Sequence, residues 1–140
     1  METARQRSQA TLMYAADYDQ TLMPATRWQD ALIPFLPDKA LENRSCLEVN
    51  FLDKNGLGFA MDSHLSGVSL NSLESSSQRI LFFETSLLQR NAHTPGTQFA
   101  ARHRDMVTKQ PHHGYLITLE GQVSSATQQE GDAATLRGMR

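Results

Sequence analysis

Five histidines and scattered carboxylates are the side chains of this sequence that could do chemistry. The histidines are His64, His93, His103, His112 and His113. On a strand, His112 and His113 would point to opposite faces, which is poor geometry for one metal ion, whereas His103 and Asp105 would share a face. We therefore expect solvent-facing loop histidines rather than a transition-metal site.

The segment Asp53-Lys54-Asn55-Gly56 begins like a calcium-binding loop. A complete loop continues with a third acidic residue and ends in a bidentate glutamate, and both are missing at the expected spacing. The segment is therefore predicted to form a tight turn. Calcium stays open as an alternative, with Asp53, Asn55 and Asp62 as candidate ligands and Glu84 as a carboxylate that the fold could bring near them.

The sequence signatures of catalysis are incomplete. A dinucleotide-binding fingerprint starts at Gly56-Leu57-Gly58, but Met61 stands where its third glycine belongs. A nucleophile elbow starts at Gly67-Val68-Ser69-Leu70, but Asn71 replaces its final glycine. We therefore expect no catalytic residue, no bound cofactor and a protein that is not an enzyme.

Composition narrows the class of protein further. The chain has 140 residues, the size of one domain, and a net charge of −2, which argues against a nucleic-acid partner. Its one cysteine, Cys46, excludes an intramolecular disulfide and is expected to pack as a small hydrophobic residue. The apolar run at residues 80–83, like every other in the sequence, is far shorter than the about 20 residues that span a bilayer. We expect no membrane span in this chain.

Two helices are predicted near the start of the chain. Residues 2–20 contain no glycine or proline and end in an apolar section with helical period. Residues 26–36 place Trp28, Leu32 and Phe35 on one stripe, and the prolines at the end of the segment stop the helix.

Short β-like segments separated by turn residues follow over residues 47–124. The most apolar of them is 79–85, and the segments 115–119 and 122–124 flank Glu120-Gly121, which predicts a two-residue hairpin turn. Little apolar content follows, so residues 128–140 are predicted to form a flexible tail behind a globular domain of residues 1–127.

These elements predict an α+β fold in which the N-terminal helix packs on a small antiparallel sheet, with a short second helix beside it. The helix would cover the sheet with Leu12, Met13, Ala15 and Ala16. Aromatic side chains are expected to fill the layer between them: Trp28, Phe35, Phe51, Phe59, Phe82 and Phe83.

Three segments also resemble a known family when they are taken together and in order. They are residues 2–24 with Tyr14-Ala15-Ala16-Asp17-Tyr18-Asp19, then Trp28-Gln29-Asp30-Ala31-Leu32, then residues 59–70 followed by Ile80-Leu81-Phe82-Phe83-Glu84-Thr85. Over about residues 2–124 the chain is similar to bacterial pseudopilin-like proteins that have a prepilin-type N-terminus and a C-terminal "H-X9-DG" motif.

The resemblance implies a type IV pilin-like architecture, in which the first half of a long N-terminal helix is apolar and membrane-embedded. This chain lacks that apolar half. The helix of Trp28 matches the family's second helix, His103 stands for the motif's histidine, and Glu120-Gly121 stands for its Asp-Gly pair, at a longer spacing.

The family consists of non-enzymatic structural subunits of type II secretion or type IV pilus-like systems. The resemblance therefore implies other pilin-like subunits as partners, if an anchor helix is encoded upstream, and an inner-membrane-anchored protein whose domain lies outside the cytoplasm. The alternative is an extracytoplasmic binding module, directed at calcium or at a glycan, that uses the polar loops 66–77 and 91–111.

Overall fold

The computed structural model describes residues 2–35, 58–73, 79–87, 89–101 and 113–137. Side chains of the first five of these residues and of residue 137 are outside that description. The helices and strands are α1 (Glu2–Asp17), α2 (Trp28–Leu32), β1 (Phe59–Asp62), β2 (Ile80–Glu84), β3 (His93–Thr94), β4 (His113–Thr118), β5 (Val123–Thr127) and α4 (Gln128–Arg137). Short 3₁₀ turns cover Ala25–Arg27, Ile33–Phe35, Ser63–Leu65 and Leu70–Ser72.

The strands form one sheet in the order β3-β1-β2-β4-β5. Three neighbouring pairs are antiparallel, whereas β1 and β3 are parallel. The prediction that helices combine with a small sheet is confirmed, but the prediction of an antiparallel sheet is wrong for β3. Strand β3 lies on the opposite side of β1 from β2, and it runs parallel to β1.

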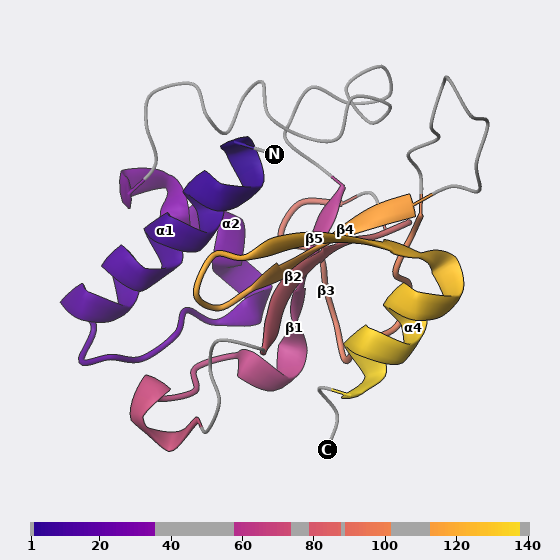
Figure 1. Cartoon of the computed structure of the whole chain (residues 1–140). Coiled ribbons are helices and arrows are strands. Elements are labelled where there is room, and N and C mark those ends of the chain that lie inside the picture. The colour runs from indigo at the N-terminus through magenta and orange to yellow at the C-terminus, as the bar shows by residue number, and fades with distance from the viewer. Residues whose placement is uncertain (1, 36–57, 74–78, 88, 102–112, 138–140) are drawn as a thin grey trace.

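The sheet separates two apolar clusters because alternate strand residues point to opposite faces. On β1, for example, Phe59 and Met61 belong to one cluster and Ala60 to the other. In Figure 1 the helices α1 and α2 lie to one side of the sheet and α4 lies to the other. The first cluster contains Ala10, Leu22, Met23, Ala25, Trp28, Leu32, Phe59, Met61, Leu65, Leu81, Phe82, Ile117 and Leu119. The second contains Ala60, Phe83, Ala92, Phe99, Leu116 and Ala126.

A register shift in β2 changes which residues reach each cluster. Ile80 pairs with Thr118 and Phe82 pairs with Ile117, so Leu81 is an extra residue in its strand. As a result Leu81 and Phe82 enter the first cluster together. The expectation that Phe83 fills the layer beneath the N-terminal helix is wrong, because Phe83 lies in the second cluster.

Helix α1 buries a more polar face than the sequence predicted. Arg7, Ser8, Thr11 and Ala15 are buried together with Ala10, whereas the predicted covering residues Leu12, Met13 and Ala16 are exposed. The helix is thus rotated about its axis relative to the predicted orientation, and contacts of Arg7 and Thr11 explain why.

The Arg7 guanidinium lies 5.5 Å from the centre of the Phe59 ring, and burial lowers the Arg7 pKa to about 10. The Thr11 hydroxyl donates to the Arg7 carbonyl at 2.9 Å. The aromatic face offsets part of the cost of burying the Arg7 cation, and the bond within the helix satisfies the Thr11 hydroxyl.

The first helix ends three residues before its predicted limit. Asp19 and Gln20 have φ angles of 56° and 59°, in the left-handed region, and the Gln20 N–H donates to the Ala15 carbonyl at 2.7 Å. This closes the end of the helix in the manner of a C-terminal cap. The predicted second helix over 26–36 is divided into α2 and two flanking 3₁₀ turns as far as Phe35.

Residues 128–140 were predicted to form a flexible tail. In the structure, residues 128–137 of this segment form the helix α4. Thr127 and Glu130 form a reciprocal cap at its start: the Thr127 N–H donates to Glu130 Oε1 at 2.9 Å, and the Glu130 N–H donates to Thr127 Oγ1 at 3.3 Å. Hydrogen bonds to its carboxylate from the Thr127 N–H and from the Thr127 side chain lower the pKa of Glu130. The Thr135 hydroxyl also donates to the Gly96 carbonyl at 2.7 Å, so the helix is tied down at both ends.

Phe99 lies against two glycines that leave room for its ring. A Cβ atom at Gly131 of α4 would stand 2.0 Å from a Phe99 ring carbon, and one at Gly114 of β4 would stand 2.9 Å from another. Both distances are far inside van der Waals contact, so the ring fixes how closely α4 approaches the sheet.

We expect Gly131→Ala to lower the free energy of unfolding by about 1–3 kcal/mol, because the added methyl group must displace Phe99. In a helix without this contact the same change would stabilise by about 0.5–1 kcal/mol, so the sign itself is informative. Urea unfolding measures the effect. In a Phe99→Leu background the added cost of Gly131→Ala should shrink, and a gain of stability in the native background would contradict this packing.

Candidate functional site

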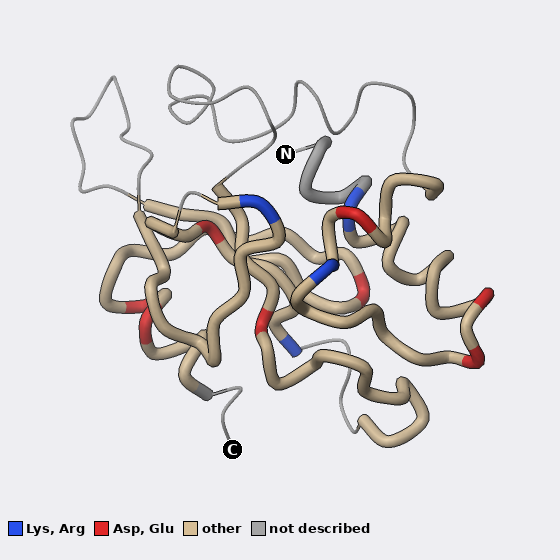
Figure 2. Tube along the Cα trace, turned by 180° about the vertical axis from the view of Figure 1, so that it is seen from behind, with Lys and Arg blue, Asp and Glu red and all other residues tan. Residues whose placement is uncertain are grey.

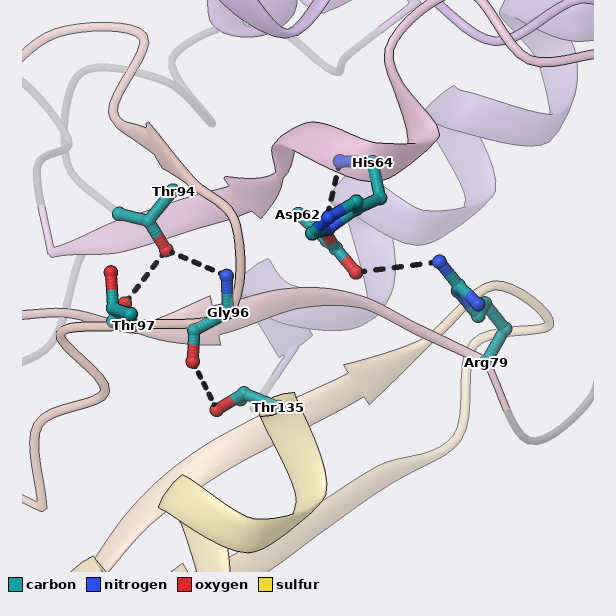
Figure 3. Close-up of polar contacts among 7 residues, drawn as sticks. All are labelled: Asp62, His64, Arg79, Thr94, Gly96, Thr97 and Thr135. Carbon is teal, nitrogen blue, oxygen red and sulfur yellow. Dashed lines mark hydrogen bonds and ion pairs between the residues drawn. The ribbon is translucent and has the colours of Figure 1, made fainter. Parts of the chain in front are cut away.

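The calcium candidate Asp62 lies at the end of β1, where it is 2% exposed. Its Oδ1 accepts hydrogen bonds from the His64 N–H at 2.9 Å and from His64 Nδ1 at 3.0 Å. Its Oδ2 lies 3.7 Å from Arg79 Nη2 (Figure 3). The carboxylate therefore caps the turn Ser63–Leu65 and neutralises nearby donors.

An aspartate bonded to a histidine also occurs in hydrolases, where the histidine activates a nucleophile. Here the two residues are neighbours in one turn, and within the described ranges no hydroxyl or thiol bonds to the His64 ring. The geometry fits a local cap better than a catalytic pair.

Of the other calcium candidates, only Glu84 lies among the described residues, and it stands apart from Asp62. Asp53 and Asn55 lie outside the described residues. Glu84 pairs with Phe59, three residues from Asp62 along β1, which is about 10 Å of strand. Among the residues with described positions, no three His, Cys, Asp or Glu side chains gather in a way that could hold a metal ion.

Beside Asp62, a group of threonines ties α4 to the loop after β3 (Figure 3). The Thr94 hydroxyl donates to the Thr97 carbonyl at 2.7 Å and accepts from the Gly96 N–H at 3.2 Å. The Gly96 carbonyl in turn accepts the bond from Thr135. These contacts close a turn and hold a helix, which is a structural role.

The histidines are less uniform than the sequence predicted. His64 is exposed, as expected, but His93 and His113 are half-buried and lie on β3 and β4. The His93 ring bonds to the Asn91 carbonyl, and the His113 ring meets Tyr115 edge-on. The prediction of loop positions is therefore wrong for these two. His103 and His112 lie outside the described residues.

The residues that carried the family resemblance have structural positions where they are described. Trp28 is fully buried, and its Nε1–H donates to the Ala92 carbonyl at 2.7 Å. Glu120 and Gly121 lie between β4 and β5, and Gly121 has a φ of 94°, which favours glycine. The prediction of a two-residue turn is wrong, because Ile117 pairs with Val123 and the Thr118 N–H donates to the Gln122 carbonyl, which leaves residues 119–121 in the loop.

Sequence reasoning missed a groove of about 290 Å³ between the end of α1 and α2. We call it the α1–α2 groove. Its lining residues are Tyr14, Tyr18, Pro24, Arg27, Asp30, Ala31 and Pro34. The tyrosines at spacing i, i+4 and the Arg–Asp pair at i, i+3 were visible as helix-face neighbours, but their convergence depends on the turn between the two helices.

Ring contacts hold the aromatic wall of the groove in place. The rings of Tyr14 and Tyr18 are stacked with centroids 4.2 Å apart and planes 14° apart, and Phe35 meets Tyr14 edge-on at 5.9 Å. Burial, with Tyr18 beside it, raises the pKa of the Tyr14 hydroxyl, an effect that Arg27 opposes. The tyrosine hydroxyls and the rings thus form a rigid surface that is both polar and apolar.

The polar wall of the groove is held by the segment before β3. Asp30 Oδ1 accepts from Arg90 through Nε at 2.8 Å and also through Nη2, while Asp30 Oδ2 accepts from Asn91 Nδ2 at 2.9 Å. The Asn91 bond, followed by that of Arg90, lowers the pKa of Asp30. Asn91 Oδ1 also accepts from the N–H groups of Gln29 and Asp30, so the carboxylate is fixed in position.

Arg27 is the opposite charge on this wall. It is exposed, and within the part of the chain that the structure describes no hydrogen bond or ion pair engages its guanidinium. Arg27 lines the groove, and a guanidinium carries five N–H donors.

Figure 2 shows that basic and acidic residues are interspersed along the trace rather than divided into two halves. Among the described elements, no helix is long and apolar enough to cross a bilayer.

Because the pKa of Asp30 is lowered in the folded protein, its carboxylate should stabilise the fold above its ordinary pKa of 3.8 and lose that effect as the pH falls through the folded value. We expect the difference in free energy of unfolding between the protein and Asp30→Asn to shrink with acidification across that range. Arg90→Gln, which removes the two guanidinium donors and their charge, should make the lowering of the Asp30 pKa smaller. A difference that does not change with pH would contradict the Asp30 contacts.

Comparisons of the chain with models of protein families, with curated proteins and with solved structures find no match.

Proposed function

We propose that this chain is a non-enzymatic structural subunit, the globular domain of a pseudopilin-like protein of a type II secretion or type IV pilus-like system. Support comes first from the order of the three sequence segments that resemble that family. It comes second from how those segments meet.

The Ser8 hydroxyl of α1 lies 3.3 Å from the Thr118 carbonyl and 3.4 Å from the Leu119 carbonyl, at the end of β4. A Cβ atom at Gly121 would stand 3.4 Å from Ser8 Oγ, which is ordinary van der Waals contact, so the turn packs directly against α1. The helix and the turn that stands for the family's Asp-Gly pair are therefore in contact.

The observation that carries the proposal is an apolar stripe on the outer face of α1. We define it as Leu12, Met13 and Ala16. Leu12 is 39% exposed and Met13 is 53% exposed, and Ala16 is also exposed, so the helix turns these side chains away from its own domain. A subunit that packs its helix against neighbouring subunits would remove this stripe from water, which is favourable.

The proposal predicts contact between the stripe and another pilin-like chain in the native cell. With p-benzoylphenylalanine in place of Ala16, ultraviolet light should produce an adduct with a second copy or with a protein that has a prepilin-type N-terminus. The same probe in place of Leu136, an exposed apolar residue of α4, should not produce that adduct.

The double substitution Leu12→Lys and Met13→Glu should abolish the adduct through position 16. Because both positions are exposed, each change should alter the free energy of unfolding by no more than about 0.5 kcal/mol. No adduct at position 16, or an adduct that persists unchanged in the charged variant, would contradict the proposed role.

A further inference from the structure

We propose that the α1–α2 groove binds a saccharide, with the face of a pyranose ring against the tyrosine pair and its hydroxyl groups bonded to Arg27 and Asp30. This inference does not depend on the proposed structural role, because the groove and the stripe are formed by different residues.

The tyrosine pair offers a surface suited to a sugar ring. Tyr18 is 54% exposed although its ring is stacked on Tyr14, and Phe35 supports Tyr14 in turn. The stacking contacts reduce the side-chain freedom that the tyrosines would lose on binding, which favours affinity. Tyrosine supplies rigid contact area with a polar tip, and a pyranose ring has the matching character of an apolar C–H face with a polar rim.

The charged wall supplies both kinds of hydrogen-bonding partner. A sugar hydroxyl both donates and accepts, so it can donate to a carboxylate and accept from a guanidinium. Asp30 is ionised and held in place by Arg90 and Asn91, and Arg27 presents donors that no described residue engages. Charge-assisted bonds of this kind are stronger than neutral ones.

The size and polarity of the groove disfavour other ligands. Its volume of about 290 Å³ is at the small end of ligand pockets, about 300–1,000 Å³. An apolar molecule would cover Arg27 and Asp30 without replacing their bonds to water, which is costly. A proline-rich peptide docks in a mainly apolar aromatic groove, whereas most of these lining side chains carry polar groups.

Four probes test the proposal by ¹H–¹⁵N correlation spectra of the labelled protein: maltotriose, cellotriose, chitotriose and digalacturonic acid. At least one should shift the amide signals of Tyr18, Arg27 and Asp30 in a saturable manner. Binding of a neutral probe would indicate recognition of the sugar ring. Binding of the acidic probe alone would indicate recognition of its carboxylate by Arg27.

Tyr18→Ala and Arg27→Gln should each weaken the affinity for the bound probe by about tenfold. Leu136→Ala, at an exposed position of α4 outside the groove, should leave it unchanged. If no probe shifts these amides at its highest soluble concentration, or if only an added proline-rich decapeptide does so, the saccharide assignment is wrong. Either result leaves the cross-linking test of the structural role unaffected.

Discussion

The buried indole of Trp28 is the contact on which the arrangement of this domain depends. Its Nε1–H donates to the Ala92 carbonyl at 2.7 Å, and the same carbonyl accepts the Met61 N–H at 3.0 Å. The indole also lies 4.6 Å from the Phe82 ring. One side chain thus joins α2 to β1, to β2 and to the segment before β3. Since an indole N–H buried without a partner is costly, this bond restricts where α2 can lie.

The position of α2 in turn creates the α1–α2 groove. Arg27 and Asp30 stand on either side of Trp28 in the sequence, and the segment that receives the indole bond also supplies Arg90 and Asn91 to hold Asp30. The same two segments, α2 and the residues before β3, therefore form both the core contact of Trp28 and the polar wall of the groove. The other side of the sheet is organised separately, by the Phe99 ring between its two glycines.

The elements whose pattern is local were predictable from the sequence. Strand β2 follows from its apolar run, and the turn at Gly121 follows from its glycine. Helix α4 has few apolar residues and was missed, although Thr127-Gln128-Gln129-Glu130 has the capping-box pattern that begins it.

What depends on tertiary contact was not predictable. The buried face of α1 was placed on Leu12 and Met13 because apolar residues usually face inward, but the position of Arg7 above Phe59 is set by the fold. Neither that contact nor the convergence of two helices on the groove leaves a periodic pattern.

The most direct test of this account is the hydrogen-exchange rate of the Trp28 indole Nε1–H. The account predicts exchange only through global unfolding, with protection equal to that of the slowest β2 amides. Exchange much faster than those amides, at a rate typical of local opening, would show that the indole does not anchor α2 to the sheet.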